Sequence, residues 1–288
     1  MPTTENEGRA SAPAAPAAPP RRRPRPYPAT VTEVTAVTPY LTRVTLGGDD
    51  LANFRWPGPG SHLKLFLPEP GRRDVELPPV DDEGFMITVP GRPRPVTRTF
   101  TPRRWDPARH RLDLEFVLHG HGPASQWATQ AKPGDQVAVS QPRRTYEVLP
   151  DTRWLLVAGD ESALPAIATL LEAISPDLAV RVLVELEDPA HQVTLPGRAN
   201  TETTWLPRTP GEKPGATLTA AIQAWTPPAE AAEGPGQVWA ACEALAVRDI
   251  RALLLGPLGF GRDRILTRGY WRAGEANHPD HDYGEDEV

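Results

Sequence analysis

The first half of the chain alternates apolar and polar residues with a period of two, which is the pattern of half-buried strands. The expected strands cover residues 29–39, 41–46, 61–67, 98–101, 112–118 and 136–140. One helix is expected at 123–131, and a long excursion rich in Pro, Gly and Asp at 68–95. Many short strands with a single helix predict a small closed antiparallel barrel.

After Pro150 the pattern changes to continuous apolar strands that alternate with helices. The expected strands cover 152–159, 179–186, 203–208, 237–241 and 263–271, and the expected helices cover 162–174, 218–225 and 243–255. Alternating units of this kind predict an α/β domain whose parallel sheet has helices on both faces.

The change of pattern predicts two domains, at 29–149 and 150–275, with the boundary near 148–152. Residues 1–28 are rich in Pro, Ala and Arg, a composition that builds no core and predicts a disordered arm. Residues 276–288 are acidic and are expected to form a solvated tail.

Composition narrows the functional class. The 288 residues include 31 Lys and Arg against 37 Asp and Glu, and the net charge of −6 argues against general nucleic-acid binding. The single cysteine, Cys242, excludes an internal disulfide and a four-cysteine iron–sulfur cluster within one chain, and it fits a cytoplasmic protein. No apolar run approaches the roughly 18 residues of a membrane span, so no stable membrane insertion is expected.

Candidate chemistry lies in two neighbouring stretches. The strand before His119 breaks into glycines and restarts as a helix, and such a turn presents backbone N–H groups at the positive end of the helix, which suits a phosphate. One strand away, Arg98 suits a pyrophosphate and Phe100 suits a flat heterocycle. Together they predict a dinucleotide that carries a flavin.

These stretches, RTFTPR and EFVLHGHGPASQWA, resemble the FAD-binding half of the siderophore-interacting proteins, which are ferric-siderophore reductases of the ferredoxin-reductase-like superfamily. Three later stretches resemble the same family, at 158–172, 238–251 and 269–274, so the resemblance covers about 30–288. It implies an antiparallel Greek-key FAD-binding β-barrel followed by an α/β nucleotide-binding domain with a parallel sheet.

The resemblance also implies the residues that bind FAD. Arg98 would meet the pyrophosphate, Phe100 would stack on the isoalloxazine where the family usually has Tyr, and Thr101 would bond near N5. The backbone amides of 122–125 would hold the pyrophosphate, Ser125 would add a hydroxyl, and Trp127 either contacts the cofactor or belongs to the helix core. The candidates are Arg98, Thr99, Phe100, Thr101, His119, Gly122, Pro123, Ala124, Ser125 and Trp127.

A second set is implied for NAD(P)H, at the carboxyl end of the first parallel strand, where open α/β sheets bind ligands. Its members are Gly159, Asp160, Glu161, Ser162 and Ala163. Asp160 and Glu161 are expected as helix-start charges rather than catalytic acids. Cys242 stands where the family usually has Gly, and a side chain there would crowd the dinucleotide.

The family binds its anionic substrate with basic residues. The matching positions are Lys64, Arg272 and either Arg143 or Arg144, with Arg144 chosen here. No metal ligand is expected, because His119 has no Cys or His partner at ligand spacing.

The expected function is an FAD flavoprotein oxidoreductase that passes electrons from NAD(P)H to Fe(III) in a siderophore. No triad or paired-carboxylate motif is present, and this chemistry requires none. Two alternatives remain open at this point: a siderophore-binding redox carrier fed by ferredoxin, and a general flavin-dependent reductase.

Overall fold

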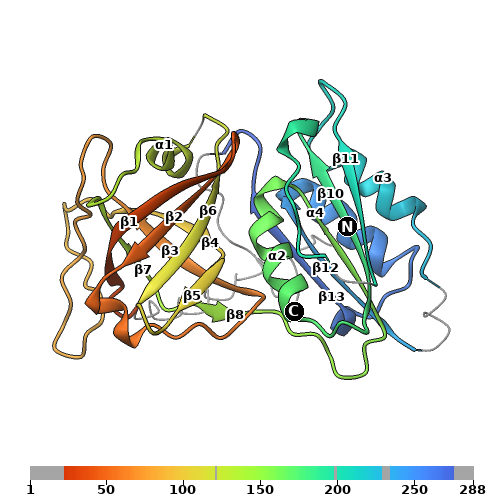
Figure 1. Ribbon diagram of the computed structural model, residues 1–288, viewed down its shortest axis with the longest axis horizontal. Helices are drawn as coiled ribbons and strands as arrows, with labels where there is room; N and C mark the ends of the chain where they lie inside the picture. The colour runs from red at the N-terminus through yellow and green to blue at the C-terminus, as the bar shows by residue number, and fades with distance from the viewer. Residues whose placement is uncertain (1–22, 121, 198–199, 229–233, 276–288) are drawn as a thin grey trace, which may run out of the picture.

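The computed structural model describes residues 23–120, 122–197, 200–228 and 234–275. Most of the predicted arm and the predicted acidic tail lie outside the described residues. The described chain forms two domains that lie side by side (Figure 1). We call them the antiparallel domain, residues 27–144, and the α/β domain, residues 154–271.

The antiparallel domain holds one curled sheet. Its strands are β1 (Tyr27–Thr38), β2 (Leu41–Gly47), β3 (Ser61–Leu67), β4 (Val96–Phe100), β5 (Arg104–Asp106), β6 (Arg111–Val117), β7 (Gln136–Val139) and β8 (Arg143–Arg144). They pair in the order β4-β3-β7-β1-β2-β6-β5, with β8 added to β3. Because β4 and β5 stand at the two ends of this order, the predicted antiparallel barrel is present as a half-barrel.

Alternation of side chains builds the core of this sheet, as the sequence pattern predicted. Leu63 and Leu65 of β3 are fully buried and pack with Phe54 and Phe116. The short 3-10 helix η1 (Asp49–Asn53) packs against β1, and the helix α1 (Pro123–Gln130) packs against β2, β3 and β6. β1 begins at Tyr27, so its first two residues lie in the stretch 1–28 that was expected as the N-terminal arm.

The α/β domain holds a parallel sheet in the order β11-β10-β9-β12-β13. Its strands are β9 (Trp154–Gly159), β10 (Ala179–Leu186), β11 (Thr201–Pro207), β12 (Gly236–Glu243) and β13 (Ile265–Trp271). The chain runs outward from β9 to β11 and then returns to the other side of β9. The order therefore reverses between β9 and β12, and the carboxyl ends there form the usual ligand crevice of such sheets.

Helices cover both faces of this sheet, which confirms the prediction. The helix α2 (Leu164–Ala173) packs on one face with β9, β10 and β12. The helices α3 (Ala216–Ala224) and α4 (Ala244–Leu255) pack on the other. Short turns η2 (Glu161–Ala163), η3 (Pro189–His191) and η5 (Arg262–Arg264) complete the domain. Figure 1 shows α2 on the side that faces the antiparallel domain.

Residues 145–153 connect the two domains, and Gln237 of β12 holds this connection in place. Its side-chain oxygen accepts hydrogen bonds from Leu149 N at 2.7 Å and Thr152 Oγ1 at 2.6 Å. Gln237 is 3% exposed, so the linker is anchored by a buried acceptor.

In the part of the chain described, every helix is too short or too polar to cross a bilayer.

Candidate functional site

Three aromatic rings bring the two predicted FAD-binding segments together. Phe100 of β4 lies 4.4 Å from Phe116 of β6, and Phe116 lies 5.5 Å from Trp127 of α1, measured between ring centroids. The Arg98–Thr101 strand and the glycine turn before α1 therefore converge, as the sequence predicted. Trp127 is half-buried against the core, so its contacts are those of a core residue of the helix.

The strand register separates the candidates of β4 onto two faces. Arg98 and Phe100 lie opposite Leu65 and Leu63, so they share the inward face of the sheet at its edge. Thr99 lies opposite Lys64 on the other face, where Lys64 Nζ donates a hydrogen bond to Thr99 Oγ1 at 2.6 Å. Arg98 and Phe100 thus face the same way.

Arg98 is a half-buried cation. Burial lowers the pKa of its guanidinium, which nevertheless stays protonated because arginine starts so high. Its Nη1 donates to Thr97 O at 2.8 Å, which fixes the direction of the side chain along β4. A partly desolvated guanidinium binds phosphate oxygens more strongly than an exposed one does.

The start of α1 presents bare backbone amides. Gly122 is its N-cap, with a positive φ of 73° and no side chain to cap the helix. Pro123 has no N–H, so the amides available at 122–125 belong to three residues and not four. A positive φ at Gly120 as well lets the loop turn sharply into the helix.

The Ser125 hydroxyl accepts a hydrogen bond within the loop that leads into α1, and its O–H can still donate. Ser125 is 4% exposed, and its Oγ accepts a hydrogen bond from His119 N at 3.1 Å. The hydroxyl therefore closes the loop that leads into α1. His119 takes part in the same closure through its backbone, and the Ser125 amide remains part of the helix start.

These residues fit FAD. A dinucleotide needs donors for its diphosphate and an apolar wall for its ring system. The amides at Gly122, Ala124 and Ser125 and the Arg98 cation supply the donors, while Phe100 supplies the wall.

At the carboxyl end of β9, two of the NAD(P)H candidates serve packing. A Cβ added to Gly159 would lie 2.6 Å from Ala163 Cβ and 2.8 Å from Ala241 O, so only glycine lets η2 approach the sheet. Ala163 itself is fully buried in the core. The methyl group of Ala163 therefore serves packing.

Asp160 is a buried helix-start charge, as expected. It is 4% exposed and caps η2, and its Oδ1 accepts from Ser162 N at 2.9 Å and Ser162 Oγ at 2.5 Å. Its Oδ2 accepts from Trp271 Nε1 at 2.8 Å, which ties the end of β13 to the end of β9. Burial raises the pKa of Asp160 to about 6, because desolvation outweighs these hydrogen bonds.

Glu161 faces the other domain. Its carboxylate accepts from Glu187 N and contacts His191 Nδ1 at 3.0 Å. The ring of His191 in turn lies 4.1 Å from the ring of Tyr40, between β1 and β2. Glu161 therefore contributes to the contact between domains.

Carboxylates from the sheet occupy the helix starts of the α/β domain. Glu185 of β10 accepts from Gly215 N at 2.7 Å and Leu218 N at 2.9 Å at the start of α3. Glu243 of β12 accepts from Leu245 N at 2.7 Å and Ala246 N at 3.0 Å at the start of α4. With Asp160 at η2, carboxylates at three strand ends neutralise helix starts of this domain.

Cys242 does not crowd this edge of the sheet. Its side chain is 0% exposed and packs in the core beneath α3 and α4. Burial raises the pKa of the thiol well above its usual value, so it is an inert apolar residue here. The expected clash between Cys242 and a bound dinucleotide is therefore wrong.

The register of β8 decides between the two candidate arginines. Arg143 lies opposite His62, and His62 shares a face of β3 with Lys64. Arg144 lies opposite the buried Ser61 and pairs with Glu147 at 3.2 Å. The structure thus favours Arg143 over Arg144, the residue chosen from the sequence. Arg272 follows β13 in the other domain and pairs with Glu275 at 3.0 Å.

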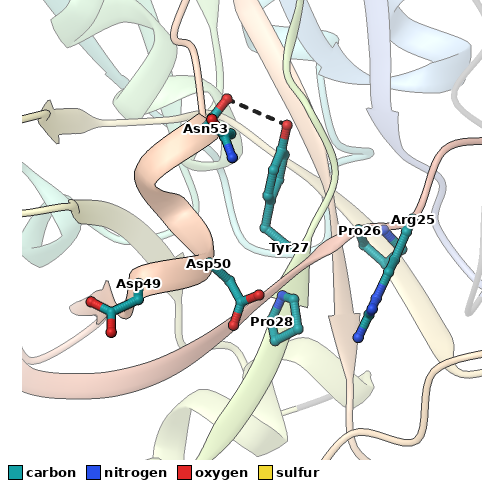
Figure 2. Close-up of a pocket in the computed structure, with 7 residues that line it drawn as sticks. All are labelled: Arg25, Pro26, Tyr27, Pro28, Asp49, Asp50 and Asn53. Carbon is teal, nitrogen blue, oxygen red and sulfur yellow. Dashed lines mark hydrogen bonds between the residues drawn. The ribbon is translucent and has the colours of Figure 1, made fainter. Parts of the chain in front are cut away.

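A hollow of about 420 Å³ lies elsewhere, between the start of β1 and η1 (Figure 2). Its walls are polar, and Tyr27 Oη donates across it to Asn53 O at 3.4 Å. Asp49 and Asp50 line it, whereas none of the FAD candidates does. It is therefore separate from the candidate site.

Sequence reasoning missed the residues that join the domains, namely Arg103, Tyr40, Glu172 and His191. Arg103 is the last residue of the RTFTPR stretch, but its partner, Glu172, is 69 residues away in the chain, so no local pattern connects the two. Trp271 was also missed, although it lies in the GYWRAG stretch.

The fold and site define a class: a two-domain flavoprotein that pairs an FAD-binding antiparallel domain with a nucleotide-binding α/β domain. Residues 30–146 match the model of the siderophore-interacting FAD-binding domain, and residues 152–274 match that of the siderophore-interacting protein. The chain belongs to the siderophore-interacting protein family.

Three relatives illustrate the similarity. The ferric vibriobactin reductase ViuB of Vibrio cholerae is 31% identical, over 85% of this chain and 89% of that protein. The NADPH-dependent ferric-chelate reductase of Escherichia coli is 40% identical, over 57% of this chain and 64% of that protein. The crystal structure of a siderophore utilization protein from T. fusca superposes with a TM-score of 0.76 at 33% identity, covering 89% of this chain and 97% of that one.

Proposed function

We propose that this protein is a cytoplasmic FAD-dependent ferric-siderophore reductase that takes electrons from NADPH and releases Fe(II). The observation that carries the proposal is the convergence of Arg98, Phe100 and the start of α1 in a chain of this family. Relatives whose names describe ferric-chelate and ferric vibriobactin reduction support the substrate, and one of those names supplies NADPH as the donor.

Each candidate residue then has a physical task. Arg98 and the amides at the start of α1 hold the diphosphate, and Phe100 presents its ring to the isoalloxazine. Thr101 follows Phe100 at the end of the strand and is proposed to bond near N5, whereas Thr99 lies on the other face and holds Lys64. FAD, when bound, accepts a hydride and gives up electrons singly. The protein supplies position and charge, and no acid–base group is needed.

Iron release follows from a change in ligand preference. Ferric iron is hard and binds the oxygen donors of a siderophore tightly, whereas the ferrous ion is held less tightly by them. One NADPH yields two electrons, so it reduces two ferric ions and leaves NADP⁺ and one proton, which is released to solvent. The siderophore itself is neither oxidised nor cleaved.

An anionic ferric siderophore would meet the basic outer face of β3. Lys64 and His62 share that face, and Arg143 lies opposite His62. We propose that the substrate binds there, and Arg272 of the α/β domain, which pairs with Glu275, stays a further candidate. Positive charge concentrated on one face of a chain of net charge −6 draws an anion to that face.

A second candidate function is a siderophore-binding redox carrier that receives electrons from a ferredoxin. The occupied helix starts of the α/β domain favour it, because they remove the usual anion site for the pyrophosphate of a donor. Cys242, which suggested this alternative in the sequence, no longer supports it.

Anaerobic stopped-flow spectroscopy separates the two. In the proposed function, NADPH bleaches the absorbance of protein-bound FAD, and a ferric siderophore restores it while a ferrous chelator captures iron. Bleaching by reduced ferredoxin alone would assign the carrier function. Reoxidation by quinones but not by ferric siderophores would assign a general flavin reductase.

A further inference from the structure

The helix α2 links the two regions in which the donor and the flavin are proposed to bind. It begins at Leu164, directly after η2 and the carboxyl end of β9, and ends at Ala173 beside the antiparallel domain. A helix of 10 residues is rigid over about 15 Å. Any tilt of α2 therefore moves the donor region relative to β4.

A bidentate ion pair binds the end of α2 to the antiparallel domain. Arg103 Nη1 donates to Glu172 Oε2 at 2.9 Å, and Arg103 Nη2 donates to Glu172 Oε1 at 2.8 Å. Arg103 follows Thr101 by two residues, so the strand end that carries the FAD candidates makes this contact itself. Parallel bonds of this kind fix orientation as well as distance.

Arg103 is also held from its own side. Its side chain is 11% exposed, and its Nε lies 3.7 Å from the buried carboxylate of Glu115. Glu115 in turn accepts from Arg43 Nη2 at 2.6 Å. Because the guanidinium is screened from water and preoriented, its pair with Glu172 is stronger than an exposed surface ion pair.

The start of α2 is held at a second point. The ring of Tyr40 packs on the ring of His191 at 4.1 Å, and His191 Nδ1 contacts Glu161 Oε1 at 3.0 Å. Leu164 and Val117 line the same narrow crevice. The antiparallel domain therefore contacts both ends of α2.

We infer that the Arg103–Glu172 pair is a positioning device that sets the α/β domain for hydride transfer from NADPH to FAD. The inference rests on the proposed function. Hydride transfer oxidises NADPH to NADP⁺ and places both electrons on the flavin, and it requires the reacting atoms within about 3–3.5 Å, where a misplacement of about 1 Å costs about 100-fold in rate. Passing single electrons to Fe(III) requires no such atom contact.

The test is Glu172→Gln in the FAD-loaded full chain. Glu172 is 43% exposed, and Arg103 keeps Glu115 as a partner, so no charge is stranded. At saturating NADPH the rate of flavin bleaching falls about tenfold. Reoxidation of the photoreduced protein by a ferric siderophore keeps its wild-type rate.

The chain offers a matched control. Arg264 makes an equally bidentate pair with Asp151, at 2.9 and 2.6 Å, and both residues follow Pro150. Asp151→Asn removes an ion pair that ties the end of the linker to the α/β domain and lies outside the antiparallel domain. Both half-reactions keep their wild-type rates in this variant.

A second measurement reads domain orientation without turnover. Nitroxide labels are placed at Gln136→Cys in β7 and Leu245→Cys in α4, both exposed, while the buried Cys242 escapes labelling. Pulsed dipolar spectroscopy then gives one narrow distance distribution for the parent, which broadens with Glu172→Gln and not with Asp151→Asn.

Wild-type bleaching in Glu172→Gln, an equal loss in both half-reactions, or an unchanged distance distribution overturns the inference. Failure of the parent protein to be reduced by NADPH overturns instead the donor in the proposed function. The distance measurement distinguishes these cases, because it requires no donor.

Discussion

Arg98 is a half-buried cation on β4 that is expected to bind the diphosphate of FAD. It shares the inward face of β4 with Phe100 and is partly removed from water. A hydrogen bond to a charged group contributes about 1.5–3 kcal/mol in such a setting. The guanidinium is therefore expected to dominate the affinity for the diphosphate.

Arg98→Met is expected to raise the Kd for FAD by about 10- to 150-fold, measured by flavin fluorescence on reconstitution. Arg98→Lys keeps the charge but loses the planar guanidinium that binds phosphate through two parallel hydrogen bonds. Its Kd for FAD is therefore expected to lie between those of the parent and Arg98→Met. Arg94→Met removes an exposed arginine just before the same strand and leaves the Kd unchanged. Equal affinity in Arg98→Met and the parent would remove Arg98 from the site.

Asp160 makes stability depend on pH in an unusual direction. Its pKa of about 6 in the folded chain lies above the ordinary 3.8. Between pH 4 and 6 the folded state therefore binds more protons than the unfolded state, and the contribution of this group to stability falls as the pH rises. The loss is complete above about pH 6 and amounts to at most about 3 kcal/mol.

Urea unfolding of the parent and of Asp160→Asn at pH 4.5 and pH 7 measures this effect. The parent loses stability relative to Asp160→Asn as the pH increases. Asp106→Asn is the control in this range: the hydrogen bond from Arg109 lowers the pKa of Asp106 below its usual 3.8, so Asp106 is largely ionised in both states at both pH values and its difference from the parent stays nearly constant. A difference between parent and Asp160→Asn that is constant with pH would contradict the buried ionisation.

At the scale of elements, α1 depends on the backbone of its N-cap. Gly122 combines a φ of 73° with a ψ of 152°, a region that only glycine occupies readily. Gly122→Ala is expected to cost about 1–3 kcal/mol of stability and to weaken FAD binding, because the loop must turn its amides away. Thermal unfolding and FAD titration measure the two effects.

Gly91→Ala is the control for the loss of stability that comes from forcing a side chain onto a positive φ. Gly91 has a φ of 78° in open surroundings outside the site. Gly91→Ala is expected to lose stability as Gly122→Ala does, but to keep the FAD affinity of the parent. Parallel losses of affinity in the two variants would show that the start of α1 has no special part in binding.

The two-residue strand β8 allows a test in which adjacent arginines are exchanged. Arg143 shares a face with Lys64 and His62, whereas Arg144 lies opposite Ser61. Arg143→Met is expected to raise the KM for an anionic ferric siderophore several-fold, while Arg144→Met leaves it near the parent value. The reverse order of effects would restore the residue chosen from the sequence.

The sequence predicted the elements whose signals are local. The period-two strands, the glycine turn before α1 and the parallel units after Pro150 could all be recognised within 10 to 15 residues. The strands β5 and β8 were missed, because three and two residues are too short to show a period. The assignment of individual FAD-binding roles to Arg98, Phe100 and Thr101 came from the resemblance to the family and not from the local pattern.

What the sequence could not show depends on register and on distant partners. Arg143 and Arg144 differ only in which residue of β3 they face, and a one-residue shift exchanges them. The Ser125 hydroxyl and Ala163 looked available and are buried. The pair between Arg103 and Glu172 joins elements of different domains, and no local pattern predicts such a contact.

At the scale of the whole molecule, the two halves differ in how they can hold an anion. The antiparallel domain offers amides fixed at the start of α1 and the half-buried cation Arg98, whereas Asp160, Glu185 and Glu243 occupy the helix starts of the α/β domain. We therefore expect a donor to rely on exposed cationic side chains there, and attraction to exposed charges weakens with salt more than attraction to buried ones.

Raising the salt concentration from about 0.05 to 0.5 M, across which the Debye length falls several-fold, is thus expected to weaken NADPH binding more than FAD binding. Parallel titrations of the apoprotein with FAD and of the holoprotein with NADPH measure the two slopes. Equal slopes would show that the donor, too, is held by fixed backbone dipoles.

The occupied helix starts have a consequence for the working cycle. A reductase must keep its prosthetic group through many turnovers and discard its spent donor after each one. If fixed amides and a half-buried arginine hold the permanent cofactor, and exposed side chains hold the transient donor, the same chain gives the first a long residence time and the second a short one.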